Sequence, residues 1–453
     1  MSKKISRRDF LKTAGMASAG LMFTSVGMNP KSYARIIGAN DRVNVGVVGY
    51  SGRFRGSLLP AFRNSMQSLN FDMIGCSDIW RLRREAAKEK LEADLGHGIR
   101  LYRNNEELYE DKDIDAVIIS TADFQHALHA AEAANAGKDM YVEKPFAETM
   151  ADAKVGREAI ERAGVIFQMG SQRRSGANYH AANDFIRSGQ FGDIVYCEMS
   201  WNVNQPGRWR LPAVVPTCKE EDTDWNRFLM NRPYEPFDPR KYCEFRLFWP
   251  YSSGIPGQWM AHQIDTVHWF TGLHHPRSVT SNAGIYLWND GRTNADTMTA
   301  VLDYGPADDL SKGFQVVYTS RFTNSAGGTK ELYYSNGGEL NLLTNKVTSN
   351  GGLTANNARA MGMEANLLDT VELKGAIEVS TEADTGGDNL TNAHMRNWME
   401  CIRSRKQPNA PVEAAYDHTA ACSMANAAIR TKQYVTFDEE RQEVLAGGKV
   451  FQY

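Results

Sequence analysis

Apolar positions along residues 41–170 follow two alternating patterns. Short runs of valine, isoleucine and other apolar residues predict buried strands, and these runs cover residues 43–49, 71–76, 101–102, 115–120, 140–142 and 165–169. Between them, apolar residues recur at helical spacing, over residues 56–68, 81–95, 126–136 and 151–163. Strands that alternate with helices of this length indicate a doubly wound parallel sheet with helices on both faces.

The pattern changes after residue 170. Segments rich in aromatic and β-branched residues predict the strands of a second, mostly antiparallel sheet, at residues 194–202, 278–287, 297–304, 314–321, 331–334 and 339–342. Two helical segments, 394–403 and 413–429, close the chain. Residues 205–257 are rich in proline and aromatic residues and show no period, so we expect a binding loop there. The predicted fold class is α/β, with a second domain built on a large open sheet.

The N-terminal segment 1–34 differs from the rest of the chain. Arg7 and Arg8 precede an apolar run over residues 13–28, and Ser32–Ala34 supplies small residues for cleavage. A basic start, a short apolar stretch and a small-residue site are typical of a secretory signal, and the arginine pair resembles the twin-arginine signal. The sequence therefore predicts export to the periplasm by the twin-arginine machinery. An ordinary secretory signal or an amphipathic helix is the alternative.

Charge and hydropathy limit the classes of partner that the protein is expected to bind. The apolar run is too short and too rich in glycine, serine and alanine for a stable membrane span. The net charge of −3 becomes −8 without residues 1–34, which hold six basic residues and one acid. An acidic protein without a basic run is a poor candidate for binding nucleic acid. The 453 residues are 42% hydrophobic and 23% charged, as in an ordinary globular protein of two or three domains.

The six cysteines show no CxxC motif and no zinc-ligand spacing. Cys76 lies in an apolar strand, and Cys401 and Cys422 lie in helical patterns, which predicts buried free thiols. A disulfide between Cys218 and Cys243 is the alternative to free thiols at these two positions, because export leads to an oxidising compartment.

The stretch Gly49–Gly56 links the first predicted strand to the first predicted helix. In that place a glycine-rich turn lets backbone N–H groups at a helix start face a pyrophosphate. The stretch departs from GxGxxG, because Ser51 and Phe54 occupy the second and third glycine positions. Arg53 and Arg55 are candidates for a charged contact to phosphate, and a solvated surface arginine is the alternative for each. We therefore expect a dinucleotide to be held by Gly49, Ser51, Gly52, Arg53 and Phe54.

Asp78 ends the second predicted strand. An acidic residue in that place accepts hydrogen bonds from the adenosine ribose, which favours NAD over NADP. Two alternatives remain. NADP is an alternative cofactor, because its 2′-phosphate could be held by the nearby arginines Arg81, Arg83 and Arg84. Asp78 is also a residue type that caps helices.

An ordered set of stretches resembles the Gfo/Idh/MocA oxidoreductases, the glucose–fructose oxidoreductase and inositol dehydrogenase superfamily. These are Ser120–Thr121, His126, Glu143–Pro145, Ala151–Ala153, Val165–Arg174, Phe185–Gly192 and the helix around His262. The resemblance implies a Rossmann domain over residues 35–165 after a signal peptide over 1–34. It implies a substrate and oligomerisation domain over residues 166–453. It also implies a bound nicotinamide dinucleotide, a sugar-like substrate and a homo-oligomer, either a dimer or a tetramer.

The resemblance assigns the reacting centre to Lys144 and His262. Lys144 matches the lysine beside the nicotinamide, where an ammonium stabilises a developing alkoxide. His262 matches the histidine that serves as general base, because imidazole titrates near neutrality. Gln258 replaces the family's aspartate four residues before this histidine, and Asp265 is the candidate to orient the imidazole instead. A packed core histidine is the alternative for His262.

The same resemblance implies further contacts. Beyond the first turn, the cofactor contacts are expected at Ser120, Thr121, His126, Glu143 and Lys144. Aromatic rings stack on sugar faces and arginines bind ring hydroxyls, and the expected substrate contacts are Arg173, Arg174, Tyr179, Asn202, Trp209, Arg210, Gln258 and Asp265. No metal is expected, because His262, Asp265 and His268 do not converge from one helix.

Export bears on the expected chemistry. The twin-arginine route carries folded proteins, and the destination holds no soluble NAD pool. We therefore expect a tightly bound NAD and a catalytic cycle that restores it. The first hypothesis is hydride transfer between a sugar or glycoside hydroxyl, for example at C3, and the bound nicotinamide. The alternatives are an NAD-dependent glycosidase that acts by transient oxidation and elimination, an epimerase, and a non-catalytic protein that binds cofactor or carbohydrate.

Overall fold

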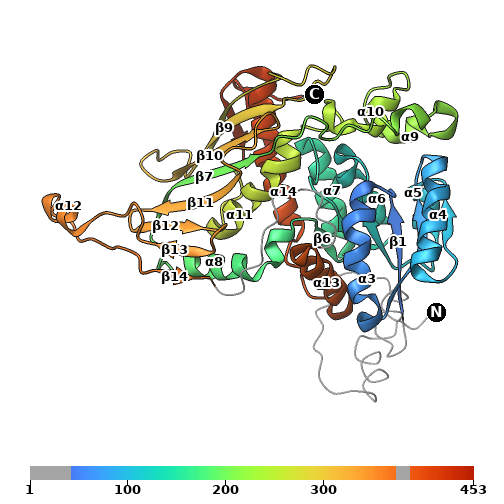
Figure 1. Ribbon diagram of the computed structural model, residues 1–453, viewed down its shortest axis with the longest axis horizontal. Coiled ribbons are helices and arrows are strands. Elements are labelled where there is room, and N and C mark those ends of the chain that lie inside the picture. Colours follow the sequence, from blue (N-terminus) through green and yellow to red (C-terminus); the bar gives the residue numbers. More distant parts are fainter. Residues whose placement is uncertain (1–41, 374–387, 453) are drawn as a thin grey trace, which may run out of the picture.

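The computed structural model describes residues 42–373 and 388–452, and the predictions for residues 1–34 lie outside this range. The first sheet has six parallel strands in the order β3-β2-β1-β4-β5-β6 (Figure 1). These strands are β1 (Val43–Val48), β2 (Phe71–Ser77), β3 (Arg100–Tyr102), β4 (Ala116–Ile119), β5 (Asp139–Val142) and β6 (Phe167–Met169). The predicted doubly wound parallel sheet is confirmed. Its order reverses between β1 and β4, which is where such sheets bind ligands.

Helices connect these strands over residues close to those predicted. They are η1 (Phe54–Leu58), α3 (Leu59–Leu69), α4 (Arg81–Leu95), α5 (Asn105–Glu110), η2 (Asp123–Gln125), α6 (His126–Asn135) and α7 (Met150–Ala163). Thr149 caps α7 by accepting a hydrogen bond from the backbone N–H of Asp152, and the left-handed Gly164 ends the helix. Asp78 does not cap α4, because that helix begins after Trp80.

The second sheet has eleven strands in the order β14-β13-β12-β11-β7-β10-β9-β8-β15-β16-β17. The central strands are β7 (Ile194–Asn202), β8 (Ser278–Gly284), β9 (Thr297–Tyr304), β10 (Phe314–Arg321), β11 (Thr329–Ser335) and β12 (Gly338–Asn341). The outer strands are β13 (Lys346–Thr348), β14 (Val371–Glu372), β15 (Val435–Asp438), β16 (Glu443–Ala446) and β17 (Lys449–Val450). Among the described strands of this second sheet, only β7 and β10 pair in parallel, so the predicted mostly antiparallel sheet is confirmed.

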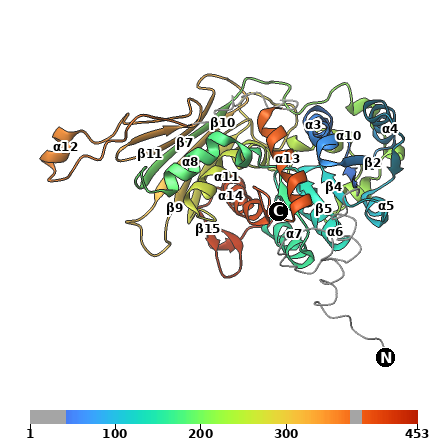
Figure 2. The same ribbon diagram turned by 90° about the horizontal axis from the view of Figure 1, so that it is seen from below.

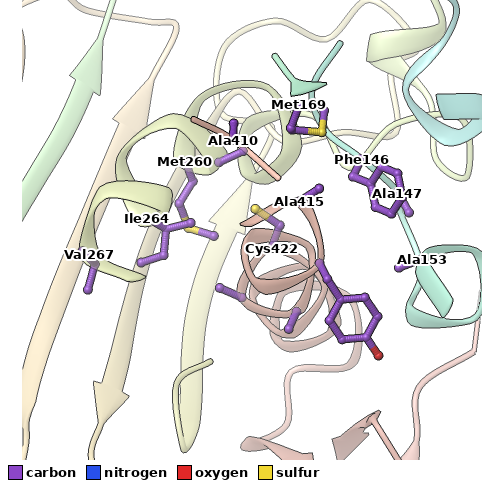
Figure 3. Close-up of a cluster of buried hydrophobic side chains, with 14 of the residues drawn as sticks. Phe146, Ala147, Ala153, Met169, Met260, Ile264, Val267, Ala410, Ala415 and Cys422 are labelled. Atoms are coloured by element: carbon purple, nitrogen blue, oxygen red, sulfur yellow. The ribbon is translucent and has the colours of Figure 1, made fainter. Parts of the chain in front are cut away.

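Helix α14 (Val412–Thr431) joins the two halves of the molecule. Buried side chains of α14, including Ala415 and Cys422, lie between Ile264 of α11 (Ala261–Thr271) and Phe146 after β5 (Figure 3). The first sheet and its helices form a first layer. The helix α14 contacts α7 of this first layer and β8 of the second sheet. With α8 (Ala177–Arg187) and α11, it covers one face of the second sheet (Figure 2).

Helix α13 (Asn389–Ser404) belongs in space to the first sheet, although it lies near the end of the chain. It packs against α3 (Figures 1 and 2), and Trp398 is fully buried with its ring 6.4 Å from Phe71 and 6.0 Å from Tyr141. Asp139, at the start of β5, pairs with Arg405 just after the helix. None of the helices in the described part of the chain is long and apolar enough to cross a membrane.

The segment between β7 and η7 (Pro256–Met260) has no long element, as its sequence predicts. It contains η4 (Val215–Thr217), η5 (Glu220–Asp222), α9 (Trp225–Leu229), α10 (Pro239–Cys243) and η6 (Phe245–Leu247). Its aromatic residues pack on Trp80 and Phe124 of the first layer. Cys218 and Cys243 are hydrogen-bonded within this cluster, and all six cysteines are buried free thiols, so the open alternative of a disulfide is not realised in the structure.

Candidate active site

A cavity of about 1370 Å³ opens beyond the carboxyl ends of the parallel strands. Its walls come from the turn after β1, the ends of β4 and β5, the strand β7, the segment 204–217 and helix α11. This volume exceeds the ~300–1,000 Å³ of a typical small-molecule site. The cavity therefore has room for a long ligand and a second molecule at one end.

The turn after β1 shapes one wall. Gly49 has φ +88°, and a Cβ there would lie 3.0 Å from Thr121 Cγ2, so glycine is required. Ser51 Oγ accepts the backbone N–H of Phe54 at 3.1 Å and lies 3.2 Å from Ser120 Oγ. Arg53 lines the cavity and donates from Nε to Glu143 Oε1 at 2.9 Å.

Lys144 follows the end of β5 and lines the cavity. Its ammonium donates to the backbone oxygen of Gln258 at 2.8 Å and to Gln258 Oε1 at 3.4 Å. Both acceptors are uncharged. Burial lowers the Lys144 pKa to about 8, while the charges of Glu143 and Asp123 oppose this effect.

Two neighbours fix the backbone around Lys144. The Glu143 carboxylate accepts from Arg53 at 2.9 Å and from Gln172 at 3.4 Å. The buried His126 ring lies 2.7 Å from the carbonyl oxygen of Pro145 and 3.3 Å from that of Thr121. These contacts tie the end of β5 to the end of β4.

His262 lines the same cavity from α11. No group in residues 42–373 or 388–452 forms a hydrogen bond with its ring, which lies 5.6 Å from the ring of Trp201. Burial and the positive charges of Lys144, Arg173 and Arg53 hold the His262 pKa well below its ordinary value. The imidazole is therefore neutral at neutral pH and able to accept a proton.

Aromatic rings form a wall beside His262. Trp201 and Trp259 lie 4.6 Å apart, Trp209 lies 6.4 Å from Trp259, and all three line the cavity. The guanidinium of Arg208 lies 4.9 Å above the Trp259 ring. A wall of this kind offers flat apolar faces next to hydrogen-bond donors.

Comparison with known proteins identifies the domain that carries the first sheet. Residues 43–171 match a family, GFO_IDH_MocA, described as an oxidoreductase family with an NAD-binding Rossmann fold. Residues 43–171 belong to the Gfo/Idh/MocA oxidoreductase family. Residues 4–24 match the twin-arginine translocation signal sequence.

Individual relatives cover less of the chain. An inositol 2-dehydrogenase of Salmonella typhimurium is 27% identical over 43% of this chain and 56% of its own length. A glycosyl hydrolase family 109 protein of Shewanella pealeana is 25% identical over 49% of this chain and 51% of its own length. The chain thus spans about half the length of these curated relatives.

The fold similarity extends over most of the described chain. A solved structure of levoglucosan dehydrogenase in complex with NADH and levoglucosan superposes with a TM-score of 0.61. The match has 14% sequence identity and covers 87% of this chain and 99% of that one. At this identity the similarity concerns the fold alone.

The Rossmann domain fits a dinucleotide. The ideal Cβ of Gly52 has no heavy atom within 4 Å, so the chain leaves open space beside the turn. Backbone N–H groups in the first turn of a helix have no partner within the helix and suit a phosphate. Thr121 Oγ1, which lines the cavity wall, has no hydrogen-bond partner among the described residues.

The structure brings most of the predicted cofactor residues together. Ser51, Gly52, Arg53, Ser120, Thr121, His126, Glu143 and Lys144 line the cavity. Phe54 is an exception, because its side chain is fully buried in the core beside Tyr50. Asp78 and Gly49 border a smaller adjoining hollow, and the Asp78 carboxylate accepts the backbone N–H groups of Tyr50 at 3.0 Å and Trp80 at 2.9 Å.

Four predicted substrate residues do not line the cavity. Asp265 and Arg174 are both buried, and Arg174 donates to both oxygens of the Asp265 carboxylate, so the expectation that Asp265 orients His262 is wrong. Tyr179 is also buried and supports the Arg173–Glu331 pair instead of facing a ligand. Asn202 lies outside the lining, whereas its strand neighbour Trp201 lies in it.

The other predicted substrate residues do line the cavity: Arg173, Trp209, Arg210 and Gln258. Sequence reasoning missed several more, which are Gln172, Trp201, Asn204, Arg246, Trp259 and Thr391. The alternation of side chains along β7 was the available indication for Trp201, because Cys197 and Met199 on the same face are apolar. Within the described residues, no group of three or more histidine, cysteine, aspartate or glutamate side chains can hold a metal ion.

Proposed function

We propose that this protein oxidises a hydroxyl of a sugar or glycoside, for example at C3, with a tightly bound NAD. The observation that carries the proposal is the pairing of Lys144 and His262 on one cavity. One is a partly buried ammonium held by uncharged oxygens, and the other is a neutral imidazole without a hydrogen bond in the described structure. A donor that stabilises an alkoxide and a base that takes its proton are what carbinol oxidation requires.

The protein's own groups divide the work. His262 accepts the hydroxyl proton at a ring nitrogen, and the Lys144 ammonium stabilises the oxygen that becomes negative. Glu143 and Arg53 hold the end of β5, so that the ammonium keeps its position. A nicotinamide ring bound beside Lys144 supplies the hydride acceptor.

The aromatic wall supports a sugar as the substrate. Trp201, Trp209 and Trp259 present ring faces on which the apolar face of a pyranose can stack. Arg208, Arg210 and Arg246 line the same region and supply donors for ring hydroxyls. We propose Arg173 and Gln258 as further polar contacts with the sugar.

NAD rather than NADP is our proposal for the dinucleotide. Asp78 places a carboxylate beside the hollow next to the turn after β1, where a 2′-phosphate would meet like charge. Arg83 borders both the cavity and this hollow and is the residue that favours the opposite choice. Replacing Asp78 by Asn should therefore narrow the preference for NAD in dinucleotide binding.

The twin-arginine signal supports export to the periplasm and explains why the dinucleotide should stay bound. That route carries folded proteins, and the periplasm has no soluble NAD pool. Each catalytic cycle must then return the cofactor through a second substrate, such as a keto sugar. We also propose a homo-oligomer formed through the open face of the second sheet, where Val195 is 51% exposed.

A redox-neutral glycosidase is the second candidate, and the relative named as a family 109 glycosyl hydrolase favours it. Transient oxidation makes a ketone, which acidifies the neighbouring C–H bond and permits elimination of the aglycone. Epimerisation at the same carbon would use the same acidity.

Incubation of the purified protein with an aryl glucoside and a keto sugar separates these candidates. A keto-glycoside product without aglycone release supports the oxidoreductase. Release of free aglycone without net oxidation supports the glycosidase instead and overturns our first proposal.

A further inference from the structure

The side-chain amide of Gln258 lies between one buried carboxylate and two cations. Its Nε2 donates to Asp123 Oδ2 at 2.6 Å. Its Oε1 accepts from Arg246 Nε at 3.0 Å and from Lys144 Nζ at 3.4 Å. The amide therefore links η2 of the Rossmann domain to the reacting ammonium.

The partners determine which way this amide points. A carboxylate only accepts hydrogen bonds, so the NH₂ group must face Asp123. Lysine and arginine only donate, so the oxygen must face Lys144 and Arg246. Both ends of the amide are satisfied in one orientation only, and Asp123 fixes that orientation.

Asp123 is otherwise poorly compensated. It is fully buried, and Ser252 Oγ donates to its Oδ2 at 2.6 Å, whereas its Oδ1 has no partner among the described residues. Burial and the charge of Asp123 raise the pKa of its neighbour Glu148 to about 8, which keeps that carboxyl protonated at neutral pH. A buried charge with so little support is costly unless it serves a nearby cation.

The charged groups around Lys144 make Asp123 the distinctive one. Glu143 from the β5 end, Arg53 from the first turn and Arg246 from η6 act on its ammonium. His262 from α11 and His418 from α14 also face it, and both have lowered pKa values, while Cys422 on α14 is a neutral thiol. The charge of Glu143 acts on Lys144 more strongly, but Glu143 also forms an ion pair with Arg53. Asp123 is the negative charge that is hydrogen-bonded to the Gln258 amide, whose oxygen accepts from Lys144.

We propose that Asp123 is a positioning residue that holds Lys144 and Arg246 in place through the Gln258 amide. In this chain it takes over the negative charge that the family resemblance predicts at position 258. The inference rests on the proposed role of Lys144 in the oxidation. Asp123 does not line the cavity, so we assign it no contact with the proposed dinucleotide or sugar.

The test exchanges the two ends of the hydrogen bond. Asp123→Asn should lower kcat about 10-fold, because the acceptor of the Gln258 hydrogen bond loses its charge, with little change in KM. It should also move the Lys144 titration to lower pH, because a negative charge is removed. Gln258→Glu alone sets two carboxylates against each other and should also lower kcat. The double variant Asp123→Asn/Gln258→Glu restores a carboxylate–amide pair and should recover most of the loss.

Competitive acetylation of Lys144 with acetic anhydride across pH, read by mass spectrometry, reports its titration without any turnover. This separates the inference from the proposed function: a wild-type protein that oxidises no sugar refutes the function, while the labelling still decides the inference. Asp139→Asn, which removes a buried carboxylate paired with Arg405 away from the cavity, is the matched control. Should Asp123→Asn not fold, Gln258→Met replaces it, and loss of the amide acceptor should likewise move the titration to lower pH.

Unchanged labelling in Asp123→Asn, or a shift no larger than that in Asp139→Asn, would overturn the proposal. A double variant no better than the worse single variant would do the same.

Discussion

The proposed reacting centre holds two residues, Lys144 and His262, whose environments lower the pKa of each side chain. Burial lowers the Lys144 pKa only to about 8, so most of the side chain remains an ammonium at neutral pH. Burial and three neighbouring cations keep His262 neutral over the same range. Each group is thus in the form that oxidation of a hydroxyl requires.

The pH dependence of kcat/KM for sugar oxidation follows from these shifts. Above about pH 8 Lys144 loses its proton and the alkoxide loses its stabilising charge, so the rate should fall. Towards acid, the rate should hold until pH drops below the lowered His262 pKa, where the base becomes protonated. Steady-state rates across pH check both limbs. A rate that keeps rising well beyond pH 8 would contradict the role given to Lys144.

Replacement of Lys144 by methionine should remove the chemistry and spare binding. Loss of one donor to a developing oxyanion costs about 10²–10³ in kcat, and the bound dinucleotide content should stay at the wild-type level. Lys90→Met, at an exposed lysine that pairs with Asp94, is the matched control and should keep full activity. Equal activity of Lys144→Met and the parent would contradict the role proposed for Lys144.

Single residues also show which parts of the candidate site could be predicted from the sequence alone. Lys144 was predictable because Glu143–Pro145 is a local motif that needs no knowledge of distant partners. The sequence did not indicate which of Trp201 and Asn202 lines the cavity. Adjacent strand residues point to opposite faces, so a shift of one residue in register exchanges the two side chains. Asp265 was assigned to the wrong partner because Arg174, which binds it, is 91 residues away in sequence.

At the scale of elements, helical periodicity predicted the bounds of α4 and most of α7, and a high content of aromatic and β-branched residues predicted β7, β9 and β10. The five short elements between β7 and η7 were beyond prediction. Each has at most five residues, and its position depends on aromatic packing against the first layer rather than on local preference.

The contact between α6 and α7 gives a prediction at this scale. A Cβ on Gly156 of α7 would lie 2.7 Å from Phe146 Cζ and 2.9 Å from the Ala127 oxygen of α6. Gly156→Ala should therefore lower the free energy of unfolding by about 1–3 kcal/mol through overpacking, although alanine is the better helix former. Denaturant unfolding measures the change. Val155→Ala, at the exposed neighbouring position, should alter it far less, and a stabilised Gly156→Ala would refute the close contact.

At the scale of the whole molecule, the chain returns to its first domain at its end. Nothing in the periodicity of residues 394–403 indicates that α13 packs on the first sheet, because an amphipathic pattern shows that a face is buried and not against what. The same holds for α14, whose buried side chains contact both layers (Figure 3).

Truncation of a residue in α13 should therefore affect the Rossmann domain. Trp398 is fully buried near Phe71 and Tyr141, and Trp398→Ala should lower the free energy of unfolding by about 3–5 kcal/mol and loosen the dinucleotide. Denaturant unfolding and dinucleotide content of the purified variant measure both effects. Tyr434→Ala, at a ring that is 59% exposed, is the control. A loss no larger than in this control would show that α13 does not support the first sheet.

The proposed oxidation requires a pyridine dinucleotide bound in the cavity against Lys144. Mass spectrometry of the small molecule that the purified native protein releases on denaturation tests this most directly. We expect NAD or NADH in an amount nearly equimolar to the protein. A preparation that releases no pyridine nucleotide, and takes up none when it is offered, would contradict it.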